Sequence, residues 1–172
     1  MSSPVVPIPI NEMARLAAVR DIGSIDKIDT SNFDQITQHS AEQLSTPFCF
    51  LSVIYSTRIK FISSFGSQVK EIPREYGICT HVIADINSSN NFERVYEIAN
   101  MLDHPVFKDN PLVCNSPEAR SYLGYTLQSD NGCNLGTLCV MDVKPRNFSD
   151  ENKFNLAVLG EIANRLLLGS IS

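Results

Sequence analysis

Two short stretches of the chain contain the residues best suited to chemistry or to ligand binding. The first, residues 71–83, places a thiol and an imidazole two positions apart at Cys79 and His81, after Pro73 and Gly77. Proline interrupts regular structure and glycine frees the backbone, so this stretch is more typical of a pocket wall than of a core. A Cys-x-His pair alone does not predict zinc, because a structural zinc site needs four ligands with a second close pair. We therefore expect a small-molecule pocket here and no metal.

The second stretch, residues 131–145, predicts a β-hairpin that forms the floor of this pocket. Asn131-Gly132 is a turn signal, because both central residues of a type I′ turn need positive φ. The run from Leu135 to Val140 is strand-like. We expect the hairpin to lie in the middle of a sheet.

Helical patterns occur near both ends of the chain. Asn11 could cap a helix whose apolar positions Met13, Leu16 and Ala17 fall on one face. A second helix is predicted from Ser31 to a point before Pro47, and its buried face is expected to hold Phe33, Ile36, Thr37, Ser40, Ala41 and Leu44. Ser149 is expected to cap a last helix, with acidic residues in its first turn.

Strand patterns occupy the centre of the chain. Residues 48–55 and 59–65 are rich in β-formers and predict an antiparallel hairpin, and residues 94–98 predict a brief strand. A short helix capped by Asp103, with Pro105 in its first turn, is also expected.

This order of elements predicts an α+β fold. We expect a central antiparallel sheet of five to six strands, with the terminal helices on one face and a loop-rich segment, residues 66–115, over the other. An irregular segment of about 50 residues is much longer than ordinary connections, and such segments are usually functional or disordered. Its apolar residues argue against disorder. Residues 1–10, with three prolines, are expected to form a tail, and residues 11–172 a single domain.

Composition excludes several classes of protein. The net charge of −5 and the absence of a basic run argue against a nucleic-acid partner. No apolar run approaches the roughly 20 residues needed to span a bilayer, and no leader pattern is present, so we expect a cytoplasmic protein without membrane insertion. Five cysteines, of which Cys49 and Cys139 lie in apolar runs, do not imply a disulfide framework.

Six blocks of sequence in one order give a specific resemblance. The chain resembles a GAF domain, the small sensory module of bacterial signalling proteins, and is most similar to the subgroup found with histidine kinases and diguanylate cyclases. The blocks are Arg15–Val19, Phe33–Thr37, Pro73–Glu75 leading to Cys79–His81, Asp109–Val113, Arg120–Tyr122 and Gly136–Val140. Together they span roughly residues 11 to 168.

The resemblance implies a ligand pocket between the sheet and residues 66–115. Its expected members combine apolar walls with a few polar groups, as small-molecule sites do: Tyr76, Ile78, Cys79, His81, Asp103, Phe107, Asn110, Arg120, Tyr122 and Tyr125. Arg120 could present its guanidinium to a carboxylate or phosphate of the ligand, or pair with Asp103 or Asp109. The ligand itself cannot be identified from the sequence.

The function implied by the resemblance is that of a small-molecule sensor in bacterial signal transduction, without catalysis of its own. The last helix, from Phe154 to Leu168, carries a wider apolar stripe than one sheet contact requires. We expect a homodimer through the terminal helices and an output partner such as a kinase of a two-component system or a diguanylate cyclase. Ligand binding would shift the balance between two helix arrangements. The chain could be free-standing or one module of a longer protein.

A thiol-dependent enzyme is the alternative interpretation. One GAF-like family, the free methionine-(R)-sulfoxide reductases, uses a pocket cysteine as nucleophile, and Cys114 and Cys79 resemble its cysteine blocks. Cys139 and Met141 stand where that family carries carboxylates, and its companion cysteine would fall within residues 87–91, which contain none. Bilin binding is disfavoured because the adjacent Cys-His pair is lacking, while cyclic nucleotide binding stays open on fold alone.

Overall fold

The computed structural model describes residues 6–84 and 94–169. In chain order the helices and strands are α1 (Glu12–Ile22), η1 (Ile25–Lys27), α2 (Ser31–Leu44), β1 (Phe48–Ile54), β2 (Arg58–Phe65), β3 (Glu71–Pro73), η2 (Arg74–Tyr76), α3 (Ile78–Ala84), β4 (Val95–Ile98), η3 (Met101–Asp103), α4 (Pro111–Cys114), β5 (Ser121–Gln128), β6 (Asn134–Asp142) and α5 (Asp150–Gly169), where η denotes a 3-10 helix. The predicted α+β class is confirmed.

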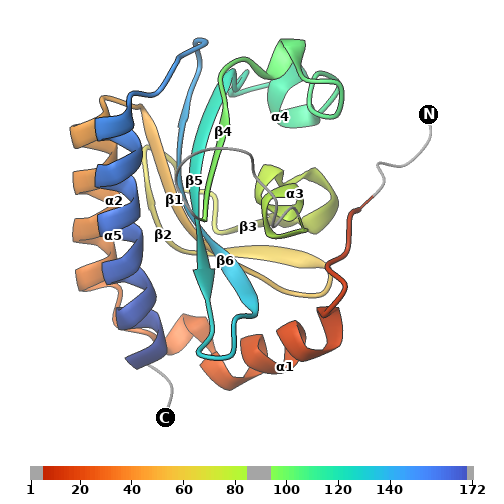
Figure 1. Cartoon of the computed structure of the whole chain (residues 1–172), viewed down its shortest axis with the longest axis vertical. Coiled ribbons are helices and arrows are strands. Elements are labelled where there is room, and N and C mark those ends of the chain that lie inside the picture. The colour runs from red at the N-terminus through yellow and green to blue at the C-terminus, as the bar shows by residue number, and fades with distance from the viewer. Residues whose placement is uncertain (1–5, 85–93, 170–172) are drawn as a thin grey trace.

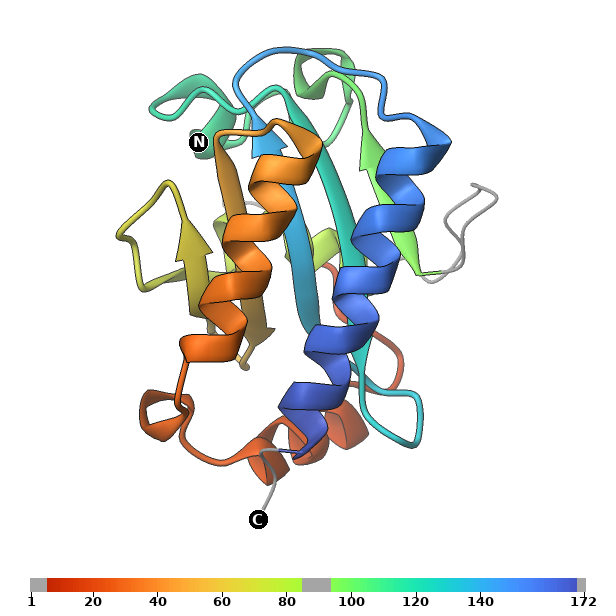
Figure 2. The same cartoon turned by 90° about the vertical axis from the view of Figure 1, so that its left-hand side faces the viewer.

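The described strands form one antiparallel sheet in the order β3-β2-β1-β6-β5-β4. All nine residues of β6 are buried, and β6 lies between β1 and β5, so the hairpin occupies the middle of the sheet as predicted. Helices α2 and α5 lie side by side against one face (Figure 2). The short helices α3 and α4 lie over the other face, and α1 crosses the lower end of the sheet (Figure 1).

The face under α2 and α5 carries the larger apolar core. Phe33, Ile36, Thr37, Ser40, Ala41 and Leu44 are all buried, as the helical spacing predicts. Ser149 caps α5, because its Oγ accepts a hydrogen bond from the backbone N–H of Asn152 at 3.0 Å. These two helices therefore follow directly from local sequence patterns.

The predicted face of α1 is wrong. Its buried residues are Arg15, Val19 and Ile22, whereas the side chain of Met13 is 88% exposed. Arg15 is buried because its guanidinium donates to the backbone carbonyls of Ile54 and Asn134. A purely apolar pattern cannot reveal such a helix face.

Two turn predictions also need correction. The short helix expected after Asp103, with Pro105 in its first turn, does not form, because residues 105–109 are turns; Asp103 instead ends η3, which Asn100 caps by accepting from the N–H of Leu102. In the β5–β6 hairpin Gly132 has positive φ but Asn131 does not, so the turn is not type I′. A longer loop forms instead, in which Ser129 and Cys133 are joined by a backbone hydrogen bond of 2.9 Å.

The predicted N-terminal tail is only partly described. Residues 1–5 lie outside the described residues, as do residues 87–91, where a companion cysteine was considered. Residues 6–9 have no regular structure before α1 begins. No helix in the described ranges is both long and apolar enough to cross a bilayer.

Candidate functional site

A cavity of about 330 Å³ lies between the sheet and the segment that covers its second face. Its floor comes from four strands and is formed by Phe48, Phe50, Phe61, Tyr122, Cys139 and Met141. Its walls come from the β2–β3 connection, from β3, from the start of α3 and from the chain around α4: Ser67, Val69, Ile72, Gly77, Ile78, Cys79, Leu112, Ser116 and Pro117. This volume falls within the range of about 300–1,000 Å³ that is typical of small-ligand sites.

The register of the sheet brings the floor together. Across β1, β6 and β5, Phe48 lies opposite Met141, which lies opposite Tyr122. Two residues further along the sheet, Phe50 lies opposite Cys139. Because side chains two apart on a strand share a face, both rows project toward α3.

Gly124 completes the second row, next to Cys139, and has no side chain to project. The Tyr122 ring occupies that space, since a Cβ added at Gly124 would lie 2.5 Å from the Tyr122 hydroxyl. The phenol therefore lies along its own strand as part of the floor.

The Tyr122 hydroxyl is the unusual polar group of the cavity. The side chain is 1% exposed, and its hydroxyl makes no hydrogen bond of normal geometry with any described residue. Burial, together with the nearby thiols of Cys139 and Cys79, raises the pKa of Tyr122 well above its usual value. The group is therefore a neutral hydroxyl at physiological pH.

Cys79 and Cys139 have little thiolate character. Burial raises the pKa of Cys79 to about 11. Burial and then the proximity of Cys79 raise the pKa of Cys139 to about 12. Since the thiolate is the reactive form and the metal ligand, neither side chain is activated in this state. No group of three His, Cys, Asp or Glu side chains within the described ranges is placed to hold a metal ion.

Three of the ten predicted site residues line the cavity: Ile78, Cys79 and Tyr122. Phe107 and His81 lie nearby but outside it, with their rings packed edge to face at a centroid distance of 4.9 Å. Burial, and then the charge of His104, lowers the pKa of His81. His81, Phe107 and His104 form an aromatic cluster that does not line the cavity.

Three further predicted residues, Tyr76, Asn110 and Asp103, do not line the cavity and make hydrogen bonds within the loops instead. Asn110 caps α4 through Leu112 N–H and donates from Nδ2 to the carbonyl of Tyr76 at 3.1 Å. This joins α4 to the turn that precedes α3. The exposed carboxylate of Asp103 accepts from Asn100.

Arg120 makes neither of its two expected ion pairs. It donates to the carbonyls of Val113 and Ala119, at 3.0 Å each, instead of to Asp103 or Asp109. The guanidinium therefore supports the α4–β5 connection.

The placement of Tyr125 in the pocket is wrong. Tyr122 and Tyr125 are three residues apart on one strand, so they point to opposite faces. Tyr125 packs under α5, where its hydroxyl donates to Glu161 at 3.0 Å and its ring lies beneath the guanidinium of Arg94.

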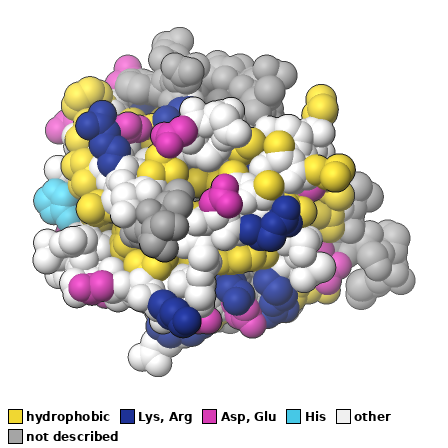
Figure 3. All heavy atoms as spheres, turned by 90° about the horizontal axis from the view of Figure 1, so that it is seen from below, with side chains coloured by type: hydrophobic (Ala, Val, Ile, Leu, Met, Phe, Trp, Pro, Cys, Tyr) yellow, Lys and Arg dark blue, Asp and Glu magenta, His cyan; other side chains and the backbone are white. Residues whose placement is uncertain are grey.

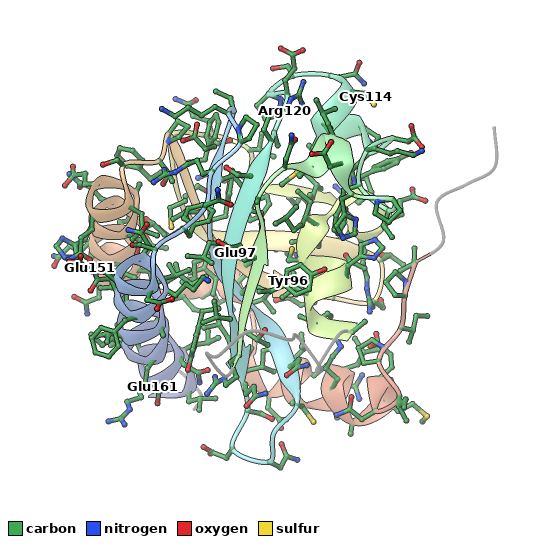
Figure 4. All side chains as sticks on the ribbon, turned by 45° about the horizontal axis from the view of Figure 1, so that its top comes forward. Tyr96, Glu97, Cys114, Arg120, Glu151 and Glu161 are labelled. Carbon is green, nitrogen blue, oxygen red and sulfur yellow. The ribbon has the colours of Figure 1, made fainter. Side chains whose placement is uncertain are left out.

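The two cysteines of the alternative interpretation are not brought together in the cavity. Cys79 lines it, whereas Cys114 is exposed at the end of α4 and its thiol donates to the carbonyl of Lys108 at 3.4 Å. Figure 4 shows Cys114 directed outward, near Arg120 at the upper end of the molecule. A role for Cys114 as a nucleophile stays a prediction.

The sequence interpretation missed the aromatic part of the floor. Phe48, Phe50 and Phe61 line the cavity, and the rings of Phe50 and Phe61 lie 4.9 Å apart. Part of this floor could have been predicted from the sequence, because Phe48 and Phe50 lie two residues apart on a predicted strand and so share a face. Only the register of β1 against β6 places them beside Tyr122.

An ion-pair network anchors the covering segment from below. Arg74, in the turn before α3, pairs with Glu12 of α1 at 2.6 Å, and Glu12 also pairs with Arg15 at 2.8 Å. Figure 3 shows that hydrophobic, basic and acidic side chains are interspersed on this lower end of the molecule. The network ties the N-terminal helix to the chain that forms the cavity wall.

Comparison with known proteins gives the following. No protein-family model matches the chain. A cyclic di-GMP phosphodiesterase of Pseudomonas aeruginosa is 32% identical over 140 residues, which are 81% of this chain, and the match spans only 23% of that protein. Among solved structures, the type II free methionine-R-sulfoxide reductase of Thermoplasma acidophilum is similar with a TM-score of 0.65 at 14% identity, over 86% of this chain and 98% of that one. The GAF domain of an Acinetobacter phosphoenolpyruvate-protein phosphotransferase has a TM-score of 0.61 at 18% identity, over 95% and 94% of the two chains.

These comparisons correct one prediction. The expectation of a protein without catalysis is wrong, because the curated relative is named as an enzyme and a reductase is among the similar structures. Neither the fold nor the types of residue in the pocket reveal whether a protein is an enzyme, since one fold hosts both enzymes and binding modules.

Proposed function

Because the chain has the fold of GAF domains, we propose that it is a sensory unit that binds a small molecule in the cavity between its sheet and residues 66–115. The cavity is the observation that carries this proposal. It is enclosed by a floor of fixed sheet residues and by walls from short helices and loops, which is the arrangement of a largely pre-formed ligand site.

We propose further that ligand occupancy controls an enzyme of cyclic di-GMP turnover. The relative in Pseudomonas aeruginosa is named as a cyclic di-GMP phosphodiesterase, and the matched region is about a quarter of its length. This supports a phosphodiesterase, rather than the kinase or diguanylate cyclase first expected, as the activity that the sensor serves. The ligand would favour one arrangement of the terminal helices, since it can shift an equilibrium only by binding one state more tightly. A dimer through α5 would transmit that arrangement.

Mass spectrometry tests the binding proposal. Native spectra of freshly purified protein should show a non-covalent mass increase that is absent from the denatured protein. Cys139→Phe would fill the cavity from its floor and should abolish the increase. Cys114→Phe makes the same substitution at an exposed thiol outside the cavity and should leave the increase unchanged. Circular dichroism would confirm that both variants fold.

A protein that is empty in native spectra, and whose thermal stability no cell extract raises, would contradict the binding proposal. For the output, cyclic di-GMP measured in cells that produce the full-length protein should respond to Cys139→Phe and not to Cys114→Phe. Equal levels in both strains would contradict control of phosphodiesterase activity through the cavity.

A further inference from the structure

The walls of the cavity restrict the chemistry of its ligand. None of the described residues that line it is Lys, Arg, Asp, Glu or His. A charged ligand would leave water without gaining an opposite charge, and burying an unpaired charge is strongly unfavourable. Phosphates, carboxylates and zwitterions are therefore poor occupants of this cavity.

The floor favours a flat apolar ring. The rings of Phe48 and Phe50 are stacked at a centroid distance of 6.3 Å, and Phe61 lies against Phe50. The polarisable sulfur atoms of Cys139 and Met141 lie in the neighbouring positions across β6. Aromatic and sulfur-containing side chains pack well against an aromatic ligand.

One polar group on the floor, the Tyr122 hydroxyl, lies close to the side chains of Thr137 and Cys139 but makes no hydrogen bond of normal geometry with a described residue. The next row of the sheet, beyond Cys139, holds Ser52 and Thr137, whose hydroxyls bond to each other at 3.1 Å. Ser52 Oγ also accepts from the N–H of Thr137. Ser52 and Thr137 therefore satisfy each other, whereas no described residue offers the Tyr122 hydroxyl an acceptor in good geometry, and a buried donor without an acceptor is costly.

We propose that the ligand is a neutral, mostly apolar molecule with an aromatic ring and one acceptor oxygen, such as a ketone, which accepts a hydrogen bond from the Tyr122 hydroxyl. This inference rests on the proposed function, because it concerns the occupant of the same cavity. It assigns Tyr122 as the residue that orients the ligand.

Three probes that differ in one functional group test the proposal. The first is propiophenone, an aryl ketone. In propylbenzene a CH2 group replaces the carbonyl of propiophenone. In 3-phenylpropanoate a carboxylate replaces the terminal methyl group of propylbenzene. Affinity is measured by titration with NMR detection of the methyl groups of Met141 and Ile78, which line the cavity. The ketone should bind about tenfold more tightly than the hydrocarbon, since one net hydrogen bond is of that size. The carboxylate should bind most weakly.

Tyr122→Phe isolates the hydrogen bond. In this variant the ketone should bind no more than twofold more tightly than the hydrocarbon, while the affinity for the hydrocarbon stays as in the wild-type protein. Tyr125→Phe removes the same atom on the opposite face and should leave the tenfold ratio intact. A ratio that survives Tyr122→Phe would overturn the assignment of Tyr122.

A second measurement does not depend on a ligand. Because the Tyr122 hydroxyl makes no hydrogen bond of normal geometry with a described residue, Tyr122→Phe should leave the urea midpoint unchanged or raise it, whereas Tyr125→Phe should lower it by removing the bond to Glu161. A lower midpoint for Tyr122→Phe would show that the hydroxyl is already satisfied and would overturn the proposal.

The remaining outcomes separate the ligand class from the function. If 3-phenylpropanoate binds more tightly than the ketone and perturbs the same methyl groups, the binding function stands and the neutral ligand class is wrong. If no probe perturbs these methyl groups, the neutral aromatic ligand class is wrong, and the native mass spectra decide separately whether the cavity binds a ligand at all.

Discussion

Tyr122 and Tyr125 show that an odd spacing along a strand places two side chains on opposite faces of the sheet. Both belong to β5 and both are buried, at 1% and 5% exposure. Their hydroxyls nevertheless differ, since that of Tyr125 donates to Glu161 and that of Tyr122 makes no hydrogen bond of normal geometry with a described residue. An odd spacing places one ring against α5 and the other in the cavity. Each tyrosine is therefore the natural control for the other.

Gly124 is expected to be required for the shape of the floor. In Gly124→Ala the new Cβ would lie 2.5–2.9 Å from the hydroxyl and ring of Tyr122, so that ring must move. We expect a loss of about 1–3 kcal/mol in the free energy of unfolding, as for other overpacked sites. Urea denaturation measures this loss, and near-UV circular dichroism reports the displacement of the tyrosine.

Two other glycines calibrate the effect of Gly124→Ala. Gly136→Ala should be more destabilising, because its Cβ would lie 1.8 Å from the backbone oxygen of Ser52, which cannot rotate away. Gly169→Ala, where nothing lies within 4 Å, should be nearly neutral. Equal stability of the Gly124 and Gly169 variants would contradict the packing of Tyr122 over Gly124.

Glu12 is expected to make stability depend on acidic pH. Burial raises the pKa of Glu12, but hydrogen bonds from Arg15 and Arg74 and the charges of both guanidiniums outweigh it and lower the pKa to about 2. A group with a depressed folded-state pKa stabilises the protein above its unfolded pKa, which is about 4.5 here. This stabilisation should be lost as the pH falls from about 4.5 to about 2.

Glu12→Gln tests this pH dependence. After allowance for screening by solvent, we expect the variant to lose about 1–2 kcal/mol of stability at neutral pH and to lose less on acidification than the wild-type protein. Urea titrations between pH 2 and pH 7 give the comparison. Glu71→Gln is the matched control, because its ion pair with Arg58 is exposed on both sides and should contribute little. Identical pH profiles for the Glu12 variant and the wild type would refute the role of Glu12.

Short elements, rather than long ones, close the cavity. Helix α3 has seven residues and α4 has four, too few to be stable by local propensity. Their positions depend on tertiary anchors: Thr80 donates to the carbonyl of Arg74 at 2.6 Å, and Asn110 joins α4 to Tyr76. The walls are therefore the part of the site that the rest of the molecule must hold in place.

Two variants of Asn110 distinguish its capping of α4 from its hydrogen bond to the carbonyl of Tyr76. Asn110→Ala removes both the cap of α4 and the bond to Tyr76, and we expect it to cost about 1–2 kcal/mol of stability. Asn110→Asp keeps the capping oxygen but lacks the amide donor, so its loss should be smaller. Hydrogen exchange should show faster opening of α4 in both variants. If neither variant is destabilised, Asn110 does not hold these elements together.

The whole molecule has two unequal faces. The large helices α2 and α5 cover one side of the sheet and the short elements cover the other, as Figures 1 and 2 show. The side chains of Phe154, Val158 and Ile162, spaced four residues apart on α5, are 60%, 44% and 46% exposed. This stripe is available for contact with a second helix.

The proposed dimer through α5 gives a prediction at this scale. Val158→Glu places a charge in the middle of the stripe and should convert a dimer into a monomer without lowering the melting temperature of the fold. Light scattering after size-exclusion chromatography measures the mass. Met13→Glu, at an 88% exposed position on α1, is the control and should leave the mass unchanged. A wild-type monomer, or a dimer that persists in Val158→Glu, would contradict this interface.

Local patterns predicted the long elements well and the site poorly. The buried positions of α2 and the burial of β6 follow from helical spacing and from an apolar run, because both depend on residues close in sequence. Arg15 was missed as a core residue because its burial depends on carbonyls about 40 and 120 residues away. Likewise, no local signal distinguishes His81, which lies outside the cavity, from Cys79, which lies inside it.

The sequence by itself determined the α+β layout and the central hairpin, because alternation and helical periodicity decide which faces are buried, and its resemblance to GAF domains implied a pocket between the sheet and residues 66–115. Only the tertiary structure decided which side chains form the floor. The pairing of β1 with β6 and of β6 with β5 sets Phe48, Met141 and Tyr122 in one row, and Gly124 leaves the space that Tyr122 fills. These contacts join residues up to about 90 positions apart, so their register is fixed by packing of the whole sheet and not by any local pattern.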